Sequence, residues 1–420
     1  MRIAVVDLIF YWPPIGGARI DLREMLRRLA RDHEVTLFVP RIDSLVPGIR
    51  LRGPLARTKF FDRGRVDEDL GFRIEPIEID ALRFTPGHLI RRLQARFEAL
   101  GIERLLLGDG WYLKPYLVEP FAHLRPIIRL YAYEGLCTKA HGIYYRNGKV
   151  CEVDPLGGGL RAALTCIGCS AQYLASYPSP TFLHEYLMAR AFTPGYRDVV
   201  RRALGAAERV LVYNEDIARL VRPFARQVDI VPGGVDLEFW ASVPPPPPMP
   251  PLRLLVPGRL DDPAKGLAVA RAAVALARDR GVPVELAFTA SVPDAKPWER
   301  PLGWLSPEQL RTALADCHTV IVPSLWPEPF GMVALEAMAA GRPVIASNVG
   351  GLGALAGHAG PCVAVSSGDA GALAAAVERA WLEPASLGGD GVVARALAAN
   401  FSWDRVYAGA YGASYPRDLV

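Results

Sequence analysis

The chain has 420 residues, 51% hydrophobic and 22% charged, with a net charge of +4 at pH 7. This composition is typical of a globular protein rather than a disordered one, and the length favours two or three domains. The small net charge gives no support to nucleic-acid binding. No apolar run approaches the ~18 residues of a membrane span, and Asp7 interrupts the N-terminal apolar run too early for a signal peptide. We therefore expect a cytoplasmic protein.

The first residues have the pattern of a buried strand, a glycine-containing turn and a helix. Residues 3–6 are apolar, Gly16 and Gly17 lie in the turn, and apolar residues recur at helical spacing over residues 19–31. Another apolar strand follows at 33–39. This unit predicts the start of a doubly wound α/β domain. Further strands are expected at 105–109, 127–131 and 209–214.

Residues 40–75 are rich in arginine, proline and glycine and show no clear periodicity. Six Arg and Lys residues between Arg50 and Arg65 make this a basic stretch. A solvated surface loop is the simpler interpretation, and peripheral contact with an anionic membrane or an anionic acceptor is the alternative. Asp67 and Asp69 form a D-x-D pattern, but no apolar strand precedes it, so we assign it no metal.

Four of the six cysteines lie close together in the sequence, at Cys137, Cys151, Cys166 and Cys169. In a reducing compartment, four thiolates in a loop-rich segment suit a closed tetrahedral zinc site. Such a site leaves no open position for catalysis, so any zinc there would be structural. Unligated thiols, disulfides and an iron–sulfur cluster are the alternatives.

A second strand–loop–helix pattern follows a proline-rich segment at 244–251, which is expected to act as a stiff, extended linker. Residues 252–256 are an apolar strand. Arg259 and Lys265 lie in the turn after it, and a long helix runs through Ala277.

Residues 319–322 form another apolar strand, followed by a turn with Glu328 and a helix that starts after Gly331. This places a carboxylate at the carboxyl end of a strand, where ligands bind in open α/β sheets. The N–H groups at the helix start would be free, and such groups suit an anion such as phosphate. These N–H groups belong to Gly331, Met332 and Val333.

The stretch from Pro323 to Ile345 resembles the E-x7-E element of retaining GT-B glycosyltransferases of family 4, the group that includes glycogen-synthase-like enzymes. Glu328 and Glu336 are the two glutamates, with P-F-G between them and G-x-P-V-I behind. The G-R-L and K-G pairs that contain Arg259 and Lys265 resemble a second element of the same family. Matches extend over most of the chain, but the strong ones lie in its second half.

This resemblance implies an α/β fold of two Rossmann-like domains facing each other across a cleft. The acceptor-side domain would comprise residues 1–243, with the cysteine-rich insert at 137–169 and a closing helix within 401–420. The donor-binding domain would comprise residues 252–400, after the linker.

The resemblance also implies roles for single residues. Arg259 and Lys265 would hold the diphosphate, Glu336 the ribose hydroxyls, and Glu328 the donor sugar. The N–H groups after Phe330 would add to the hold on phosphate, and the paired glycines Gly16 and Gly17 would let the backbone approach the donor. Family members often carry His or His-Asp after the strand at 127–131. In this sequence Tyr133 and Glu134 stand there, with His141 as a weaker candidate.

The function implied is transfer of a sugar, with retention, from a nucleotide-sugar donor that is most often UDP-linked to a hydroxyl of a small molecule or glycan. No catalytic metal is expected, because a phosphate oxygen takes the acceptor's proton. A GT-B epimerase or phosphorylase and a non-catalytic sugar-nucleotide-binding protein are the alternatives. A cysteine-cluster interaction protein would explain residues 137–169 but not the remaining motifs. The sequence does not indicate an oligomeric state.

Overall fold

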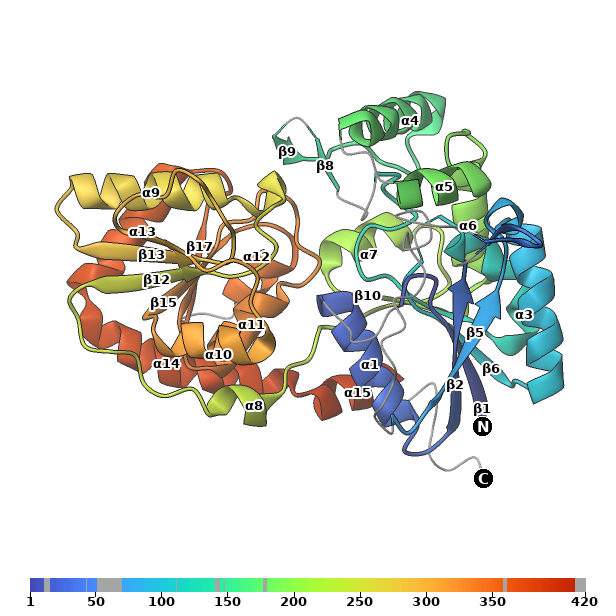
Figure 1. Ribbon diagram of the computed structural model, residues 1–420, viewed down its shortest axis with the longest axis horizontal. Coiled ribbons are helices and arrows are strands. Elements are labelled where there is room, and N and C mark those ends of the chain that lie inside the picture. The colour runs from blue at the N-terminus through green and yellow to red at the C-terminus, as the bar shows by residue number, and fades with distance from the viewer. Residues whose placement is uncertain are drawn as a thin grey trace. The chain divides into compact units, whose positions relative to one another are not determined.

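The computed structural model describes residues 1–10, 16–42, 44–50, 70–110, 112–139, 144–146, 148–176, 180–357 and 361–411 (Figure 1). The chain divides into two compact units. Unit 1 comprises Met1–Tyr144, Cys151–Val231 and Tyr407–Val420, and unit 2 comprises Tyr145–Val150 and Pro232–Val406. Each unit has its own parallel sheet and its own hydrophobic core.

Unit 1 is built on a seven-stranded sheet of order β11-β10-β7-β6-β1-β2-β5, in which all neighbours pair in parallel. Successive strands run outward from β1 in one direction and from β6 in the other, so the strand order reverses between β1 and β6. The strands are β1 (Arg2–Val6), β2 (Glu34–Arg41), β5 (Arg73–Glu78), β6 (Arg104–Leu107), β7 (Ile127–Arg129), β10 (Arg209–Val212) and β11 (Val228–Ile230). Two short hairpins, β3 (Ser44–Val46) with β4 (Ile49–Arg50) and β8 (Tyr145–Arg146) with β9 (Lys149–Val150), lie outside the two parallel sheets.

Helices cover both faces of this sheet, as in a doubly wound domain. Helices α1 and α3 lie on opposite sides of it (Figure 1). Ala4 and Val6 of β1 pack in one cluster with Leu93 and Phe97 of α3, while Leu26 of α1 is buried on the other side. The helices are α1 (Gly17–Leu29), α3 (Pro86–Leu100), α4 (Gly159–Ser176), α5 (Pro180–Met188), α6 (Tyr196–Ala206) and α7 (Glu215–Val221).

Unit 2 is built on a six-stranded parallel sheet of order β14-β13-β12-β15-β16-β17, and its strand order reverses between β12 and β15. Nearly continuous apolar runs form the central strands, as expected for strands covered on both faces. The strands are β12 (Leu252–Val256), β13 (Val284–Phe288), β14 (Glu299–Pro301), β15 (Thr319–Val322), β16 (Val344–Ser347) and β17 (Cys362–Val365).

In unit 2, α9 and α13 lie on one side of the sheet and α10, α11 and α14 on the other (Figure 1). The last helix, α15, belongs to both units, and within unit 1 Arg209 donates a hydrogen bond of 3.2 Å to the carbonyl of Ala410. The helices are α8 (Leu237–Ala241), α9 (Leu267–Asp279), α10 (Pro307–Ala315), α11 (Met332–Ala339), α12 (Gly350–Ala356), α13 (Ala370–Leu382), α14 (Pro384–Ala398) and α15 (Trp403–Tyr411).

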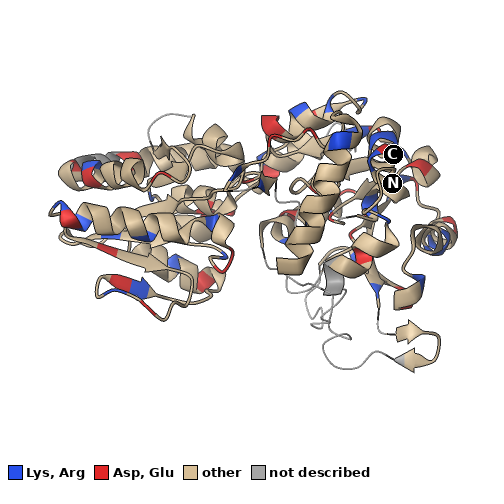
Figure 2. Ribbon diagram, turned by 90° about the horizontal axis from the view of Figure 1, so that it is seen from above, with Lys and Arg blue, Asp and Glu red and all other residues tan. Residues whose placement is uncertain are grey.

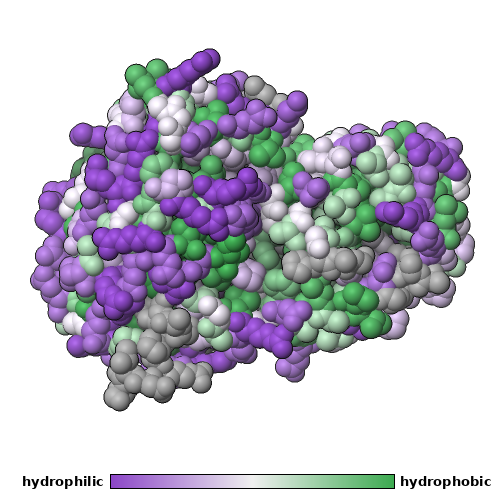
Figure 3. Space-filling model, turned by 180° about the vertical axis from the view of Figure 1, so that it is seen from behind, coloured by the Kyte–Doolittle hydropathy of each residue, from purple (hydrophilic) through white to green (hydrophobic). Residues whose placement is uncertain are grey.

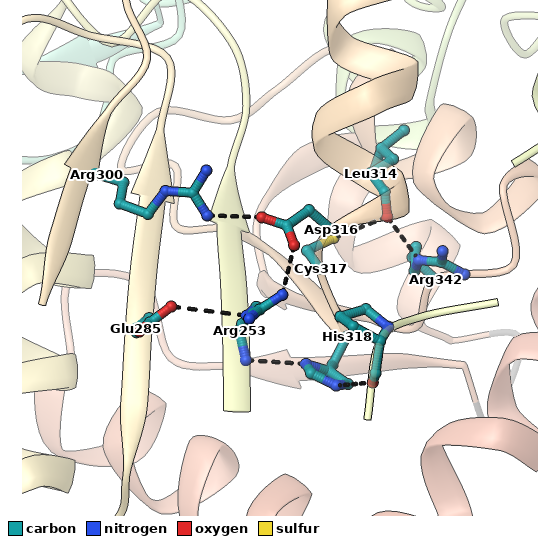
Figure 4. A network of polar contacts seen from close by, with 9 residues as sticks. Arg253, Glu285, Arg300, Leu314, Asp316, Cys317, His318 and Arg342 are labelled. Atoms are coloured by element: carbon teal, nitrogen blue, oxygen red, sulfur yellow. Dashed lines mark hydrogen bonds and ion pairs between the residues drawn. The ribbon is translucent and has the colours of Figure 1, made fainter. Parts of the chain in front are cut away.

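The proline-rich segment 244–251 is part of unit 2 and is anchored to its sheet. Arg342, which is fully buried, donates a hydrogen bond to the carbonyl of Pro244. The Nε2 atom of His318 lies 2.8 Å from the carbonyl oxygen of Pro247, and its Nδ1 accepts the N–H of Arg253 at 2.9 Å (Figure 4). These contacts require neutral His318, and burial lowers its pKa. The segment is therefore held along its length rather than free.

Two local expectations differ from the structure. Cys166 and Cys169 lie on helix α4 rather than in a loop, because residues 160–164, at its start, are all good helix formers. Residues 73–78, which overlap the end of the unpatterned stretch, form the edge strand β5, where Pro76 is tolerated because an edge strand need not donate on both sides.

The surface matches the near balance of charge in the sequence. Figure 2 shows basic and acidic residues interspersed on the helices of both units, and Figure 3 shows mainly hydrophilic side chains on the visible face of unit 1. Among the described residues, no helix is long and apolar enough to cross a membrane. Most of the basic stretch, including the D-x-D pattern, falls in residues 51–69, outside the described part of the chain.

Candidate functional site

The second sheet has a candidate ligand site at the point where its strand order reverses. The loops after β12 and β15 leave the carboxyl ends of two adjacent strands there. Crevices at such reversals are where open α/β sheets bind ligands. The loop after β12 carries Arg259 and Lys265, and the loop after β15 carries Glu328, so three predicted residues lie at this edge.

Glycine lets these two loops approach each other closely. Gly266 has a φ of +76°, and a Cβ atom there would lie 1.9 Å from the carbonyl oxygen of Pro323. The N–H of Leu325 donates to the carbonyl of Ala264 at 2.8 Å and joins the loops. The backbone of the short 3-10 turn that holds Lys265 is therefore fixed against the loop after β15.

Lys265 and Glu328 meet in this contact. One carboxylate oxygen of Glu328, Oε1, accepts hydrogen bonds from Lys265 Nζ at 2.6 Å, Ser324 Oγ at 2.7 Å and Trp326 Nε1 at 3.0 Å. Glu328 is only 9% exposed. The Lys265 ammonium also lies 4.9 Å from the centre of the Trp326 ring, within the range of a cation–π contact. Sequence reasoning missed Ser324 and Trp326, although they lie only four and two residues before Glu328.

The start of helix α11 faces the same edge of the sheet. Gly331 precedes the helix with a φ of +100°, and a Cβ there would lie 2.4 Å from the Leu352 side chain. Over the described part of the chain, the N–H groups of Met332 and Val333 donate no hydrogen bond. Open N–H groups at a helix start carry partial positive charge and suit an anion.

A third loop, after β16, closes around the turn of Glu328. The N–H of Gly351 donates to the carbonyl of Glu328 at 2.7 Å. Gly350 has a φ of +53°, and a Cβ there would lie 2.3 Å from the same carbonyl oxygen. The backbone of Glu328 is thus enclosed by glycines, which fixes the direction of its side chain.

Two further predicted residues have side chains that are open to a ligand. Arg259 is exposed, and within the residues that the structure describes its guanidinium makes no hydrogen bond or ion pair. Glu336, on α11, is likewise unpartnered among the described residues, and burial raises its pKa to about 7. The side chain of Phe330, in contrast, is buried, with its ring centre 5.9 Å from that of Phe401, so only its backbone borders the site.

In unit 1, Gly16 and Gly17 lie where α1 begins, after β1. Gly16 has a φ of +90°, and a Cβ there would meet no atom within 4 Å. The glycine is therefore needed for the backbone conformation rather than for close packing inside the unit. Their expected role in approaching a donor stays a prediction.

The predicted acceptor-side residues are more enclosed than the sequence suggested. Tyr133 is 1% exposed and stacks on Tyr144 with ring centres 4.9 Å apart. The carboxylate of Glu134 accepts hydrogen bonds from Lys114 Nζ at 2.9 Å and from the N–H groups of Tyr131 and Ala132 at 2.7 and 2.6 Å. Both residues hold the loop after β7. His141 lies outside the described residues.

The four clustered cysteines do not form a metal site in the structure. None of the six cysteines is in a disulfide. Burial raises the pKa of the Cys137 thiol to about 12, and the charges of Cys166 and Cys169 add to the rise, so these three lie in one neighbourhood. Even so, no three His, Cys, Asp or Glu side chains of the described chain are placed to share a metal ion. The metal-binding expectation for Cys137, Cys151, Cys166 and Cys169 has no support in this placement.

A separate cavity of about 300 Å³ lies beside α10 in unit 2. Asp316 bridges Arg253 and Arg300 at its wall, with ion pairs of 2.5 and 2.6 Å (Figure 4). None of the predicted site residues lines it. Its cations are already neutralised, so we place the chemistry at the strand reversal instead.

Comparison with known proteins finds similarity over the segment that contains the strand reversal of unit 2. Residues 251–382 match the family model described as glycosyl transferases group 1. This segment is therefore similar to the group 1 glycosyltransferases. The matched segment includes Arg259, Lys265, Glu328 and Glu336.

Similarity to curated proteins extends over about half of the chain. The glycogen synthase of Mycobacterium tuberculosis is 31% identical over 207 residues, which are 46% of this chain and 49% of that protein. The chain spans about half the length of the curated relatives it matches.

Solved structures match almost the whole chain. The sucrose-phosphate synthase from Thermosynechococcus elongatus has a TM-score of 0.63 at 18% identity, covering 97% of this chain and 96% of that one. Anabaena HepE in complex with UDP and glucose has a TM-score of 0.59 at 13% identity, covering 98% of both chains. At these identities the likeness establishes the fold, which is GT-B: two Rossmann-like α/β domains.

Proposed function

We propose that this protein is a retaining glycosyltransferase that moves a sugar from a nucleotide-sugar donor to a hydroxyl group of an acceptor. The observation that carries the proposal is the contact of Lys265 with Glu328 at the strand reversal of unit 2, beside the open N–H groups of α11. This arrangement combines cations for a diphosphate with a carboxylate for a sugar.

In this proposal the diphosphate of the donor lies against Arg259, Lys265 and the start of α11. Arg259 offers a guanidinium with no partner among the described residues, and Met332 and Val333 offer N–H groups. Negative charge on the diphosphate grows as the sugar leaves. Fixed cations and N–H dipoles stabilise that charge most in the transition state, which is what accelerates a reaction.

Glu336 is proposed to accept hydrogen bonds from the ribose hydroxyls, as acidic residues do in other Rossmann-like sites. Its carboxyl group is largely buried and unpartnered within the described chain, so a ligand hydroxyl would satisfy it. We propose UDP as the nucleotide, with support from the HepE structure, which is similar in fold and is reported with UDP and glucose.

Glu328 is proposed to contact the donor sugar and to stabilise the positive charge that develops on its ring. The bond between the anomeric carbon and the phosphate oxygen breaks as the bond to the acceptor oxygen forms on the same face. The leaving phosphate oxygen takes the proton of the acceptor hydroxyl. Arg259 and Lys265 supply the positive charge for the leaving group, and the proposal includes no catalytic metal.

A thermal-shift panel of UDP, GDP, ADP and dTDP tests the nucleotide site. Ligand at about 100 times its Kd should add roughly 2.7 kcal/mol of stability. We expect a shift with one nucleotide, reduced in Glu336→Gln, and slow release of that nucleotide from its sugar conjugate without acceptor. Retention is then read from the anomeric configuration of the free sugar by NMR. Absence of a shift with every nucleotide, or shifts without turnover, would contradict a transferase.

A structural zinc at the four clustered cysteines stays a prediction. It requires the thiols of Cys137, Cys151, Cys166 and Cys169 to move together from their present placement. Elemental analysis of protein purified without chelators tests it, and a zinc content well below one per chain would remove it.

A further inference from the structure

The first sheet also reverses its strand order, and acidic residues lie at that reversal. Asp7 follows β1 directly and Asp109 follows β6, the two strands between which the order reverses. Asp7 is fully buried. Its Oδ1 accepts the N–H of Ile9 at 3.0 Å, and its Oδ2 accepts the N–H of Asp109 at 2.8 Å. Asp7 therefore holds the loop after β6 in place.

The approach of the two strand ends depends on Gly108. A Cβ atom at this position would lie 2.8 Å from Oδ2 of Asp7. A side chain at this position would push the loop away and break the hydrogen bond that the N–H of Asp109 donates to Asp7. The position of Asp109 thus depends on the strand order, on its hydrogen bond to Asp7 and on Gly108.

Asp109 itself has no partner for its carboxylate. It is 8% exposed, and no hydrogen bond or ion pair to its side chain exists in the described part of the chain. Burial raises the pKa of both Asp7 and Asp109, and the charge of Glu134 raises that of Asp109 further. A carboxyl group buried without a partner destabilises a fold, so such a group calls for a ligand.

The charges around Asp109 decide what kind of ligand fits. The cations that face it are Arg19 and Lys114. Lys114 is bound to Glu134 at 2.9 Å and to the carbonyl of Arg129 at 2.9 Å, and Arg19 donates to the carbonyl of Ile9 at 3.3 Å. With Asp7, Asp109 and Glu134 ionised, the acids outnumber these two cations by one. A phosphate or carboxylate would be repelled, whereas a hydroxyl can donate to the open carboxylate.

We propose that Asp109, positioned by Asp7, binds a hydroxyl group of the acceptor. The part of the acceptor that contacts Asp109 is then a neutral polyhydroxy group, a sugar or a polyol. The inference rests on the proposed function, since it assigns the substrate of the second half of the transfer. Asp109 then takes the acidic acceptor-side role that the sequence predicted for Glu134, because both carboxylate oxygens of Glu134 already accept hydrogen bonds within the protein.

The test measures binding rather than transfer. Glucose and myo-inositol are titrated against the whole protein by saturation-transfer NMR, alongside glucose 6-phosphate and myo-inositol 1-phosphate. We expect a neutral probe to bind more tightly than its phosphate. Asp109→Asn should weaken that binding about tenfold or more, because a hydrogen bond to a charged group is replaced by a neutral one. Asp229→Asn, the same change at an ion-paired carboxylate of unit 1, should leave probe binding unchanged.

Thermal melting separates a binding role from a structural one. If Asp109 binds ligand, Asp109→Asn should melt at the same or a higher temperature than the wild type at pH 8, where the buried carboxyl is ionised, and the difference should shrink at pH 5. A structural role predicts lower melting at both pH values. This readout does not depend on any ligand.

Three results would overturn the inference: equal probe binding by Asp109→Asn and the wild type, tighter binding of the phosphates, or binding of no probe by the wild type. The proposed function is judged separately, by nucleotide binding and nucleotide-sugar turnover of the wild-type protein. Loss of polyol binding in Asp109→Asn without any nucleotide binding would support this site and refute the transferase.

Discussion

Replacing Glu328 by glutamine separates two effects of its negative charge, one on the donor sugar and one on the binding of the diphosphate by Lys265. Glutamine keeps the side-chain length and an oxygen that can accept from Ser324 and Trp326, but it removes the negative charge that lies 2.6 Å from Lys265 Nζ. In the proposed mechanism that charge stabilises the sugar ring in the transition state. It also neutralises Lys265 and repels the diphosphate that Lys265 would bind.

The size of the second effect follows from the geometry. A phosphate oxygen one hydrogen bond of ~2.8 Å beyond the Lys265 ammonium would lie about 5 Å from Glu328. Two unit charges at that distance repel by roughly 3 kcal/mol at an effective dielectric constant of 20. Water at the open side of the site reduces this to about 1 kcal/mol, which is about fivefold in affinity. We therefore expect Glu328→Gln to bind UDP about fivefold more tightly, while turnover falls on the order of 10²-fold.

Calorimetric titration of UDP and single-turnover kinetics with the UDP-sugar test this prediction. Ser324→Ala is the matched control, because it removes one hydrogen bond to Glu328 and keeps the charge. Its UDP affinity should stay within about twofold of the wild type. If Glu328→Gln loses UDP affinity together with turnover, the carboxylate serves to position Lys265 rather than to act on the sugar. If turnover is unchanged, the proposed mechanism is wrong.

The remaining predictions concern stability. Gly266→Ala places a methyl group 1.9 Å from the carbonyl oxygen of Pro323, at a residue with positive φ. It should lower the free energy of unfolding, measured in urea, by about 2–4 kcal/mol. The control Gly281→Ala also has a positive φ but meets no atom within 4 Å, so it should cost about 1 kcal/mol. Burial lowers the pKa of His318 below its unfolded value, so its contribution is complete above about pH 6.5 and is lost as the pH falls towards the folded-state pKa; urea midpoints that stay level from pH 7.5 to 5 would argue against a neutral His318. Cys169→Ser should lower the melting temperature while turnover, measured well below that temperature, stays close to the wild-type value. Lost turnover at an unchanged melting temperature would place the cysteine cluster in the chemistry.

The donor-side residues could be read from the sequence because each lies in a short local motif. Lys265 and Glu328 are each followed within three residues by a glycine at positive φ, and each loop follows an apolar strand whose bounds the sequence predicts. Only one long-range fact was needed, namely that β12 and β15 are neighbours. The order of a doubly wound sheet supplies that fact.

The acidic site of unit 1 could not be read in this way. Asp7 and Asp109 are 102 residues apart, and each alone is an ordinary aspartate after a strand. The sequence placed the acidic role on Glu134 because that residue follows β7 at the expected distance. It gave no sign that Lys114, 20 residues earlier, would occupy the carboxylate. Partner choice among buried charges depends on packing across the sheet, which local patterns do not contain.

Other buried charges in unit 1 show that Asp109 differs from its surroundings. Arg129 is 1% exposed, yet it is bound to Asp21 at 3.0 Å. Lys114 and Glu134 are bound to each other, with further hydrogen bonds to the backbone. The other buried charged side chains of unit 1 that the structure describes each have at least one hydrogen-bond or ion-pair partner, as in globular proteins generally. Within this described part of unit 1, Asp109 alone among them has no side-chain partner, and it lies where the strand order reverses. Because an unsatisfied buried carboxyl lowers stability, we expect its retention to reflect ligand binding rather than packing.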